Sequence, residues 1–236
     1  MWMKSEPLEL FSAAFMPLVF GTVFIYVFGG AISGNGLDYK QFVLPGLTFQ
    51  TVAVVARLTG VWLNLDFANG MMERFRSLPI ARSSVLAGRI AADLCRMVVA
   101  LAVMYAFAFA IGLRVPGGVA AVFGAVLLML AFGAALACAS AFLGLALRAP
   151  QTVQTVGSVW MIPLQFGSSM FVPTSTMPDW LRAVAEANPV TLVCDACRAL
   201  IQGVDATSPV LGTLAWTAAL IAVFGWLSVR QYARRC

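Results

Sequence analysis

The chain has 236 residues, of which 61% are hydrophobic and 11% are charged, and its formal net charge is +5. Soluble domains carry about 25% charged residues, so a soluble domain is excluded, because it would have too little polar surface to cover its apolar side chains. The sequence also contains no histidine, which removes the commonest general base and metal ligand. We therefore expect an all-α integral membrane protein in which residues 1–236 form a single transmembrane domain.

Apolar runs predict six transmembrane helices, since about 20 apolar residues are needed to cross the hydrocarbon core of a bilayer. The first run, residues 10–32, carries no charge and is too long for the core of a signal peptide, so we expect it to be retained. A turn and a short polar loop with Asp38 and Lys40 should follow it. The other spans are expected at about residues 42–65, 84–112, 119–147, 152–172 and 209–229.

The loop between the second and third predicted spans contains a short amphipathic helix within residues 67–83. Met71, Phe75 and Leu78 are spaced i, i+4 and i+7, which places them on one helix face, and Pro79 ends the helix. About two turns cannot cross a bilayer, so this helix lies on the membrane surface or docks into a partner. The candidate docking residues are Glu73, Arg74, Phe75, Arg76, Ser77, Leu78 and Pro79.

Two charged residues are predicted within spans. Arg57 lies well inside the second span, where an arginine needs a partner or a water-filled cavity. The sequence leaves open whether its partner is Asp93 of the third span or whether Arg57 lines a transport pathway. Asp93 has Arg89 and Arg96 at i−4 and i+3, which favours a local ion network over a proton relay.

The fourth and fifth spans carry different patterns. In the fourth, Gly133, Ala137 and Ala141 recur at every fourth residue, a spacing that lets another helix approach closely. The fifth contains Gln154 and Gln165 and is the least apolar of the six, so both glutamines are candidate pathway residues.

The long connection over residues 173–208 predicts a helical hairpin. Pro178 opens an amphipathic helix that carries Trp180 on its apolar face, and the Asn188–Pro189 pair ends it. A second helix is expected at about residues 191–202. An interfacial or re-entrant hairpin would place Trp180 among the lipid headgroups. The residues that define the hairpin are Pro173, Pro178, Trp180, Asn188 and Pro189.

The basic residues orient these elements. Ten of the 15 lysines and arginines lie in one alternating set of connections, four lie in the other set, and Arg57 lies inside a span. The positive-inside rule then places both termini and the amphipathic loop helix in the cytoplasm. Since the basic residues sit at span ends, the positive charge does not indicate a nucleic-acid partner.

No pattern for catalysis, cofactor binding or metal binding is found. A P-loop requires a lysine after its glycine turn, and neither Lys4 nor Lys40 has that context. Cys194 and Cys197 form a C-x-x-C pair, but two cysteines three residues apart on a helix are poorly placed for a disulfide. We expect them to be packing residues.

Two segments carry a resemblance to a known family. Residues 70–80 (G-M-M-E-R-F-R-S-L-P-I) resemble the cytoplasmic loop of ABC type-2 permeases. The later motifs Phe171–Pro173, Met177–Leu181, Asn188–Pro189, Asp195 and Arg198 resemble the outer loop of the same family. Val27–Gly30 and Leu44–Gly46 are similar to the daunorubicin/doxorubicin-resistance branch.

The resemblance implies the permease subunit of an ATP-driven exporter in the cytoplasmic membrane. It implies two copies of a separate ATPase subunit, which would bind ATP and Mg, and a second permease copy or homologue. The cargo would be a hydrophobic or amphiphilic, drug-like molecule. Export of a lipid or lipid-linked glycan, or a non-transporting membrane subunit, stays open.

Only nine residues precede the first span, where the resemblance implies an amphipathic helix, so we expect a chain shortened at that end.

Overall fold

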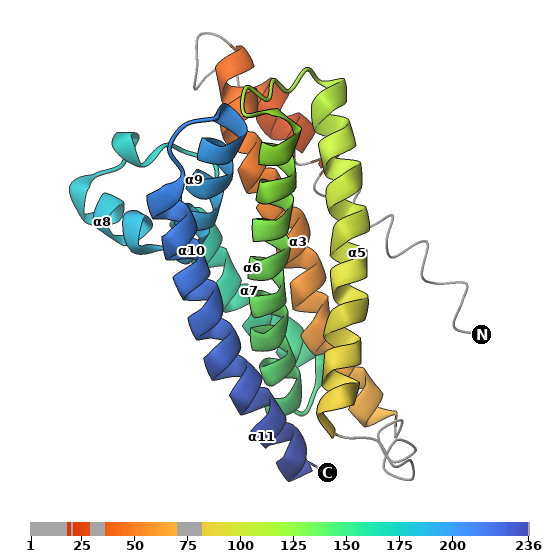
Figure 1. Ribbon diagram of the computed structural model, residues 1–236. Coiled ribbons are helices and arrows are strands. Elements are labelled where there is room, and N and C mark those ends of the chain that lie inside the picture. Colours follow the sequence, from red (N-terminus) through yellow and green to blue (C-terminus); the bar gives the residue numbers. More distant parts are fainter. Residues whose placement is uncertain (1–17, 20, 29–35, 70–81, 236) are drawn as a thin grey trace.

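The computed structural model describes residues 18–19, 21–28, 36–69 and 82–235, which form helices and connecting turns. Most of the helices run side by side as a bundle (Figure 1). The elements are η2 (Phe24–Phe28), α3 (Gly36–Ala68), α5 (Arg82–Ala110), α6 (Gly118–Ala146), α7 (Pro150–Phe166), η3 (Thr174–Thr176), α8 (Asp179–Ala187), α9 (Pro189–Gln202), α10 (Thr207–Leu220), η4 (Ile221–Gly225) and α11 (Trp226–Arg235).

Four stretches of the described chain are long and apolar enough to cross a membrane: Tyr39–Ala68, Ala87–Ala110, Gly118–Ala146 and Thr207–Tyr232. The first of them belongs to α3, which packs against α5, α6, α7, α9 and η2 and is the most buried of the four. The last is formed jointly by α10, η4 and α11, which continue one another.

The connections gather at two ends of the bundle (Figure 1). The end of α3, the start of α5, the α6–α7 turn and the C-terminal end of α11 lie together at one end. The α5–α6 turn and the α9–α10 connection lie at the opposite end, and α8 projects from the side of the bundle nearer to it. Successive connections thus lie at alternating ends of the bundle, as they must when consecutive helices each span the membrane.

The contact between α3 and α6 depends on small residues. A Cβ atom on Gly60 would overlap the carbonyl oxygen of Ser140, and a Cβ atom on Gly144 would overlap the carbonyl oxygen of Gly60. About three turns before Gly144 on α6, a Cβ atom on Gly133 would overlap Val52. The close helix approach expected from the small-residue spacing of the fourth span is therefore present.

Gly60→Ala is expected to lower the thermal unfolding midpoint of the detergent-solubilised protein, because the new methyl group forces the two backbones apart. Overpacking of this kind costs about 1–3 kcal/mol. Gly88→Ala is the matched control, since a Cβ atom at Gly88 meets nothing within 4 Å. That control should be neutral or stabilising by up to about 1 kcal/mol, given the helix propensities of the two residues. Equal midpoints for the two variants would contradict the packing account.

Two of the predicted boundaries are wrong. The second span was expected after a polar loop, but α3 already begins at Gly36, so Asp38 and Lys40 lie on the helix. Lys40 is accommodated there because its ammonium group lies 5.7 Å from the ring centroid of Tyr26. The fifth span was expected to reach residue 172, but α7 ends at Phe166, where the backbone N–H of Gly167 bonds to the carbonyl of Pro163. Most of residues 10–32 lies outside the described residues.

Candidate functional site

Helix α7 carries a polar stripe along one side. At about 100° per residue, Gln151, Gln154, Ser158 and Gln165 fall on the same face, since they are spaced i, i+3, i+7 and i+14. Gln151 and Gln154 are exposed, Ser158 is half-buried and Gln165 is buried. The two glutamines predicted from sequence thus belong to one continuous face.

Arg57 on α3 lies against this stripe. Its Nη1 donates a hydrogen bond to Ser158 Oγ at 3.1 Å, and that hydroxyl donates to the carbonyl of Gln154 at 2.9 Å. The absence of a side chain on Gly157 leaves room for the stem of Arg57, whose Cγ would lie 3.4 Å from a Cβ there. Since α3 ends eleven residues later at Ala68, Arg57 lies about 16 Å from that helix end. This half-buried polar contact therefore lies far from that end of the bundle.

Asp93 is not the hydrogen-bond partner of Arg57. Of the two alternatives left open by the sequence, the pairing of these two residues is therefore excluded. Asp93 is 2% exposed and accepts hydrogen bonds from Thr59 Oγ1 at 2.8 Å and Arg96 Nη1 at 2.7 Å. The Nε of Arg89 lies 3.6 Å from the same carboxylate, and its Nη1 lies 3.4 Å from Asp66. The expected ion network around Asp93 is present, and it ties α3 to α5.

A buried arginine, Arg198 on α9, joins three segments near the opposite end of the bundle. Its Nε donates to the carbonyl of Phe42, and its guanidinium carbon lies 3.8 Å from the centroid of the Phe42 ring. Nη1 donates to Ser169 Oγ and to Asp195, and Nη2 donates to the carbonyls of Ser169 and Met170. This cluster clamps α9 to the start of α3 and to the segment after α7.

Asn188 fixes the junction between α7, α8 and α9. Its Nδ2 donates to the carbonyls of Leu164 and Gly167, which lie at the end of α7, and its Oδ1 accepts from the backbone N–H of Val190. The side chain therefore caps the end of one helix and the start of another. Pro189 occupies the first turn of α9, where its missing N–H has no cost.

The two-helix arrangement predicted for residues 173–208 is present. Pro178 immediately precedes α8, and Pro173 precedes the short turn η3. Trp180 is 72% exposed on α8. Helix α9 packs against α10, α6 and α3, so it is part of the bundle, whereas α8 projects from it (Figure 1).

The role of Arg198 was not predicted from the sequence, in which this residue stands out only as part of the motif that resembles the outer loop. The local signal was an Asp195–Arg198 pair at i, i+3 on an otherwise apolar helix. Cys194 and Cys197 on the same helix are unpaired and fully buried, as expected of packing residues, and the thiol of Cys197 lies 3.7 Å from the carbonyl oxygen of Ala125. The candidate docking residues Glu73 to Pro79 lie outside the described residues.

The described residues form helices, four of whose stretches are apolar enough to span a membrane. Within these spans lie the ion network of Asp93 and the hydrogen-bonded Arg57. The protein is therefore a multi-pass membrane protein. Residues 2–201 match the model of the ABC-2 type transporter family. The chain therefore belongs to the ABC-2 type transporter family.

Two similar proteins carry names of drug-resistance permeases. The daunorubicin resistance ABC transporter permease protein DrrB1 of Streptomyces coeruleorubidus is 37% identical over 232 residues, which cover 98% of this chain and 82% of that protein. The doxorubicin resistance ABC transporter permease protein DrrB of Mycobacterium tuberculosis is 27% identical over 213 residues, covering 88% of this chain and 74% of that protein. The resemblance to this branch is thereby confirmed.

Proposed function

We propose that this chain is the permease subunit of an ATP-binding-cassette exporter that moves a hydrophobic or amphiphilic, drug-like molecule out across the cytoplasmic membrane. Membership of the ABC-2 type transporter family and the daunorubicin and doxorubicin in the relatives' names support this proposal. The structural observation that carries it is the half-buried polar contact of Arg57 with α7, about 16 Å from the end of α3.

Polar groups at this depth require water or protein around them, because hydrocarbon cannot satisfy them. The exposed glutamines of the α7 stripe, Gln151 and Gln154, therefore favour a surface that faces a second permease copy or homologue across a hydrated pathway. Arg57 and Gln154 line this pathway in our proposal, and the buried Gln165 lies beneath its surface on the same face of α7. Asp93 does not, since its ion network holds α3 and α5 together.

The energy comes from a separate ATPase subunit, present in two copies, which binds ATP and Mg. Residues 73–79 form the docking helix for this subunit, between the end of α3 at Ala68 and the start of α5 at Arg82. Closure of the ATPase dimer on ATP would move both helices at once, because the Asp93 network joins them near this end. Their joint tilt would change access to the pathway.

Six spans complete the architecture, with residues 10–32 as the first and α7 as the fifth, together with the four apolar stretches. Both termini and the docking helix lie in the cytoplasm. The α8–α9 pair forms an outer interfacial or re-entrant hairpin with Trp180 at headgroup level.

We expect Ser175→Cys to react with a membrane-impermeant maleimide in intact cells, and Ser77→Cys only after permeabilisation. The reverse pattern would contradict this orientation.

Arg57→Leu is expected to reduce drug efflux from cells by about 10- to 100-fold, which corresponds to losing a charged hydrogen bond of about 1.5–3 kcal/mol in the pathway. The protein should still insert, since leucine is favourable in a span. Arg114→Leu, which removes the same charge from the exposed α5–α6 turn, is the matched control and should export normally. Wild-type efflux by Arg57→Leu at wild-type membrane levels would refute the pathway role.

A further inference from the structure

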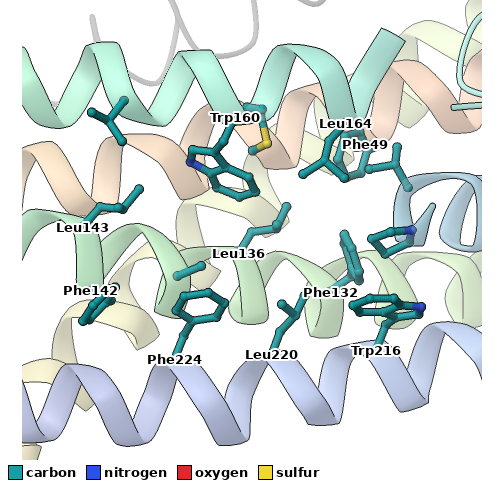
Figure 2. A pocket seen from close by; sticks show the side chains of 15 residues that line it. Phe49, Phe132, Leu136, Phe142, Leu143, Trp160, Leu164, Trp216, Leu220 and Phe224 are labelled. Atoms are coloured by element: carbon teal, nitrogen blue, oxygen red, sulfur yellow. The ribbon is translucent and has the colours of Figure 1, made fainter. Parts of the chain in front are cut away.

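An apolar groove of about 450 Å³ lies between α7 and α10, with α6 as its floor (Figure 2). Phe132, Leu136 and Leu143 line the floor, Trp160 projects from α7, and Trp216 projects from α10. The lining side chains are apolar except for the indole N–H groups of Trp160 and Trp216; the N–H of Trp160 is buried, and no polar surface is exposed on the wall. The polar stripe of α7 lies on a different flank of that helix, since Ser158 is about 160° from Trp160 around the helix axis.

A void of this size is unusual in a packed bundle, and this one is open to its surroundings. Protein interiors are packed as densely as organic crystals, with few voids larger than a water molecule. Water is a poor occupant, because a bound water needs two to four polar partners, and the groove wall offers none. The occupant must therefore be apolar along its whole buried length.

The length of the groove and its position within the apolar spans both fit a hydrocarbon chain as its occupant. From Phe132 to Leu143 its floor follows eleven residues of α6, or about 17 Å parallel to the helix axis. The floor, α6, and one wall, α10, belong to apolar spans, so the groove lies in the hydrocarbon layer of the membrane. It also opens outward, because Val156 and Trp216 on its two rims are 37% and 42% exposed.

We infer that this groove is a binding site for one acyl chain of a bilayer phospholipid, which enters between α7 and α10 and lies against α6. A drug-like molecule fits it poorly, because pockets for such ligands place a few polar groups to hold them. A polar substituent buried here would find no exposed hydrogen-bonding group on the wall, and burying it would cost free energy. A second permease copy is better placed on the polar flank of α7.

The test uses the full chain reconstituted in vesicles of phosphatidylcholine and phosphatidylglycerol that contain a phosphatidylcholine with a mid-chain diazirine. After illumination, mass spectrometry should find adducts concentrated on residues 132–143 and on Trp160. Ala139→Phe, which fills the groove floor, should lower these adducts about tenfold, because its ring takes the space of several methylene groups. Val103→Phe, at an exposed position of α5, is the matched control and should leave them unchanged.

If Ala139→Phe does not fold, Trp216→Ala serves as the second variant, since it removes a partly exposed rim and should also lower the adducts. Adducts spread evenly over the lipid-exposed helices would overturn the inference. So would their loss on adding doxorubicin, which would make the drug the occupant, or efficient disulfide formation between copies of Trp216→Cys, which would make a second copy the occupant. The assay needs neither ATPase nor export, so its outcome is independent of the proposed function.

Discussion

Replacing Phe75 by alanine is expected to abolish binding of the ATPase subunit and, with it, drug export. Phe75 is the aromatic residue on the apolar face of the predicted docking helix, between Met71 and Leu78. An aromatic anchor in a partner's groove typically contributes about 2 kcal/mol or more to binding, and 2 kcal/mol corresponds to about a thirtyfold loss of affinity. Copurification of the tagged permease with the ATPase measures this effect directly.

A charge reversal should have a similar result. Arg76→Glu places a carboxylate where a basic side chain can meet acidic groups of the partner. Phe109→Ala is the matched control, because it removes an exposed aromatic ring near the opposite end of α5. It should copurify and export as the unmodified chain does. If Phe75→Ala and Arg76→Glu still bind the ATPase and export at normal rates, residues 73–79 form only a surface anchor.

Replacing Arg198 by alanine is expected to cause the largest loss of folded protein. The Arg198 side chain is 8% exposed, and its guanidinium group bonds to α9, to the start of α3 and to the segment after α7. Removing one partner of a buried ion pair costs about 3–5 kcal/mol, and here three segments lose their common attachment. Yield of monodisperse protein and its thermal midpoint measure the effect.

Two further variants sharpen this prediction. Arg198→Lys keeps the charge but lacks the planar fork that reaches both Ser169 and Phe42, so it should recover only part of the stability. Arg182→Ala is the matched control, because the partly exposed Arg182 bonds to carbonyls of the neighbouring η3 turn. Its loss should be small. A normal midpoint for Arg198→Ala would show that the cluster is not a structural clamp.

The sequence predicted features that depend on local patterns. Long apolar runs identified the spans, because a bilayer requires about 20 apolar residues in sequence. The spacing of Gly133 and its neighbours predicted the close approach of α6 to another helix, and the spacing of Arg89, Asp93 and Arg96 predicted their ion network. In each case the sequence pattern that carried the prediction lies within a few residues, although the partner helix of α6 could not be identified from it.

Features set by contacts between distant residues were not predictable in this way. The end of α7 at Phe166 depends on Asn188, which caps carbonyls 21 and 24 residues earlier. The clamp at Arg198 reaches Phe42, 156 residues away. The start of α3 was misplaced because charged residues were taken as a loop, although Lys40 can lie beside Tyr26 on a helix end.

The most direct test of the proposed function is ATP-driven drug transport by purified components. The permease and its ATPase partner would be reconstituted together in vesicles, with the ATPase facing outward, and uptake of a panel of hydrophobic and amphiphilic drugs would be followed after adding ATP and Mg. We predict uptake that requires ATP and both proteins, and that falls to the background rate with Phe75→Ala permease. Equal uptake without ATP or without the ATPase, or none with both present and hydrolysing ATP, would contradict the assignment of this chain as a drug-exporting permease.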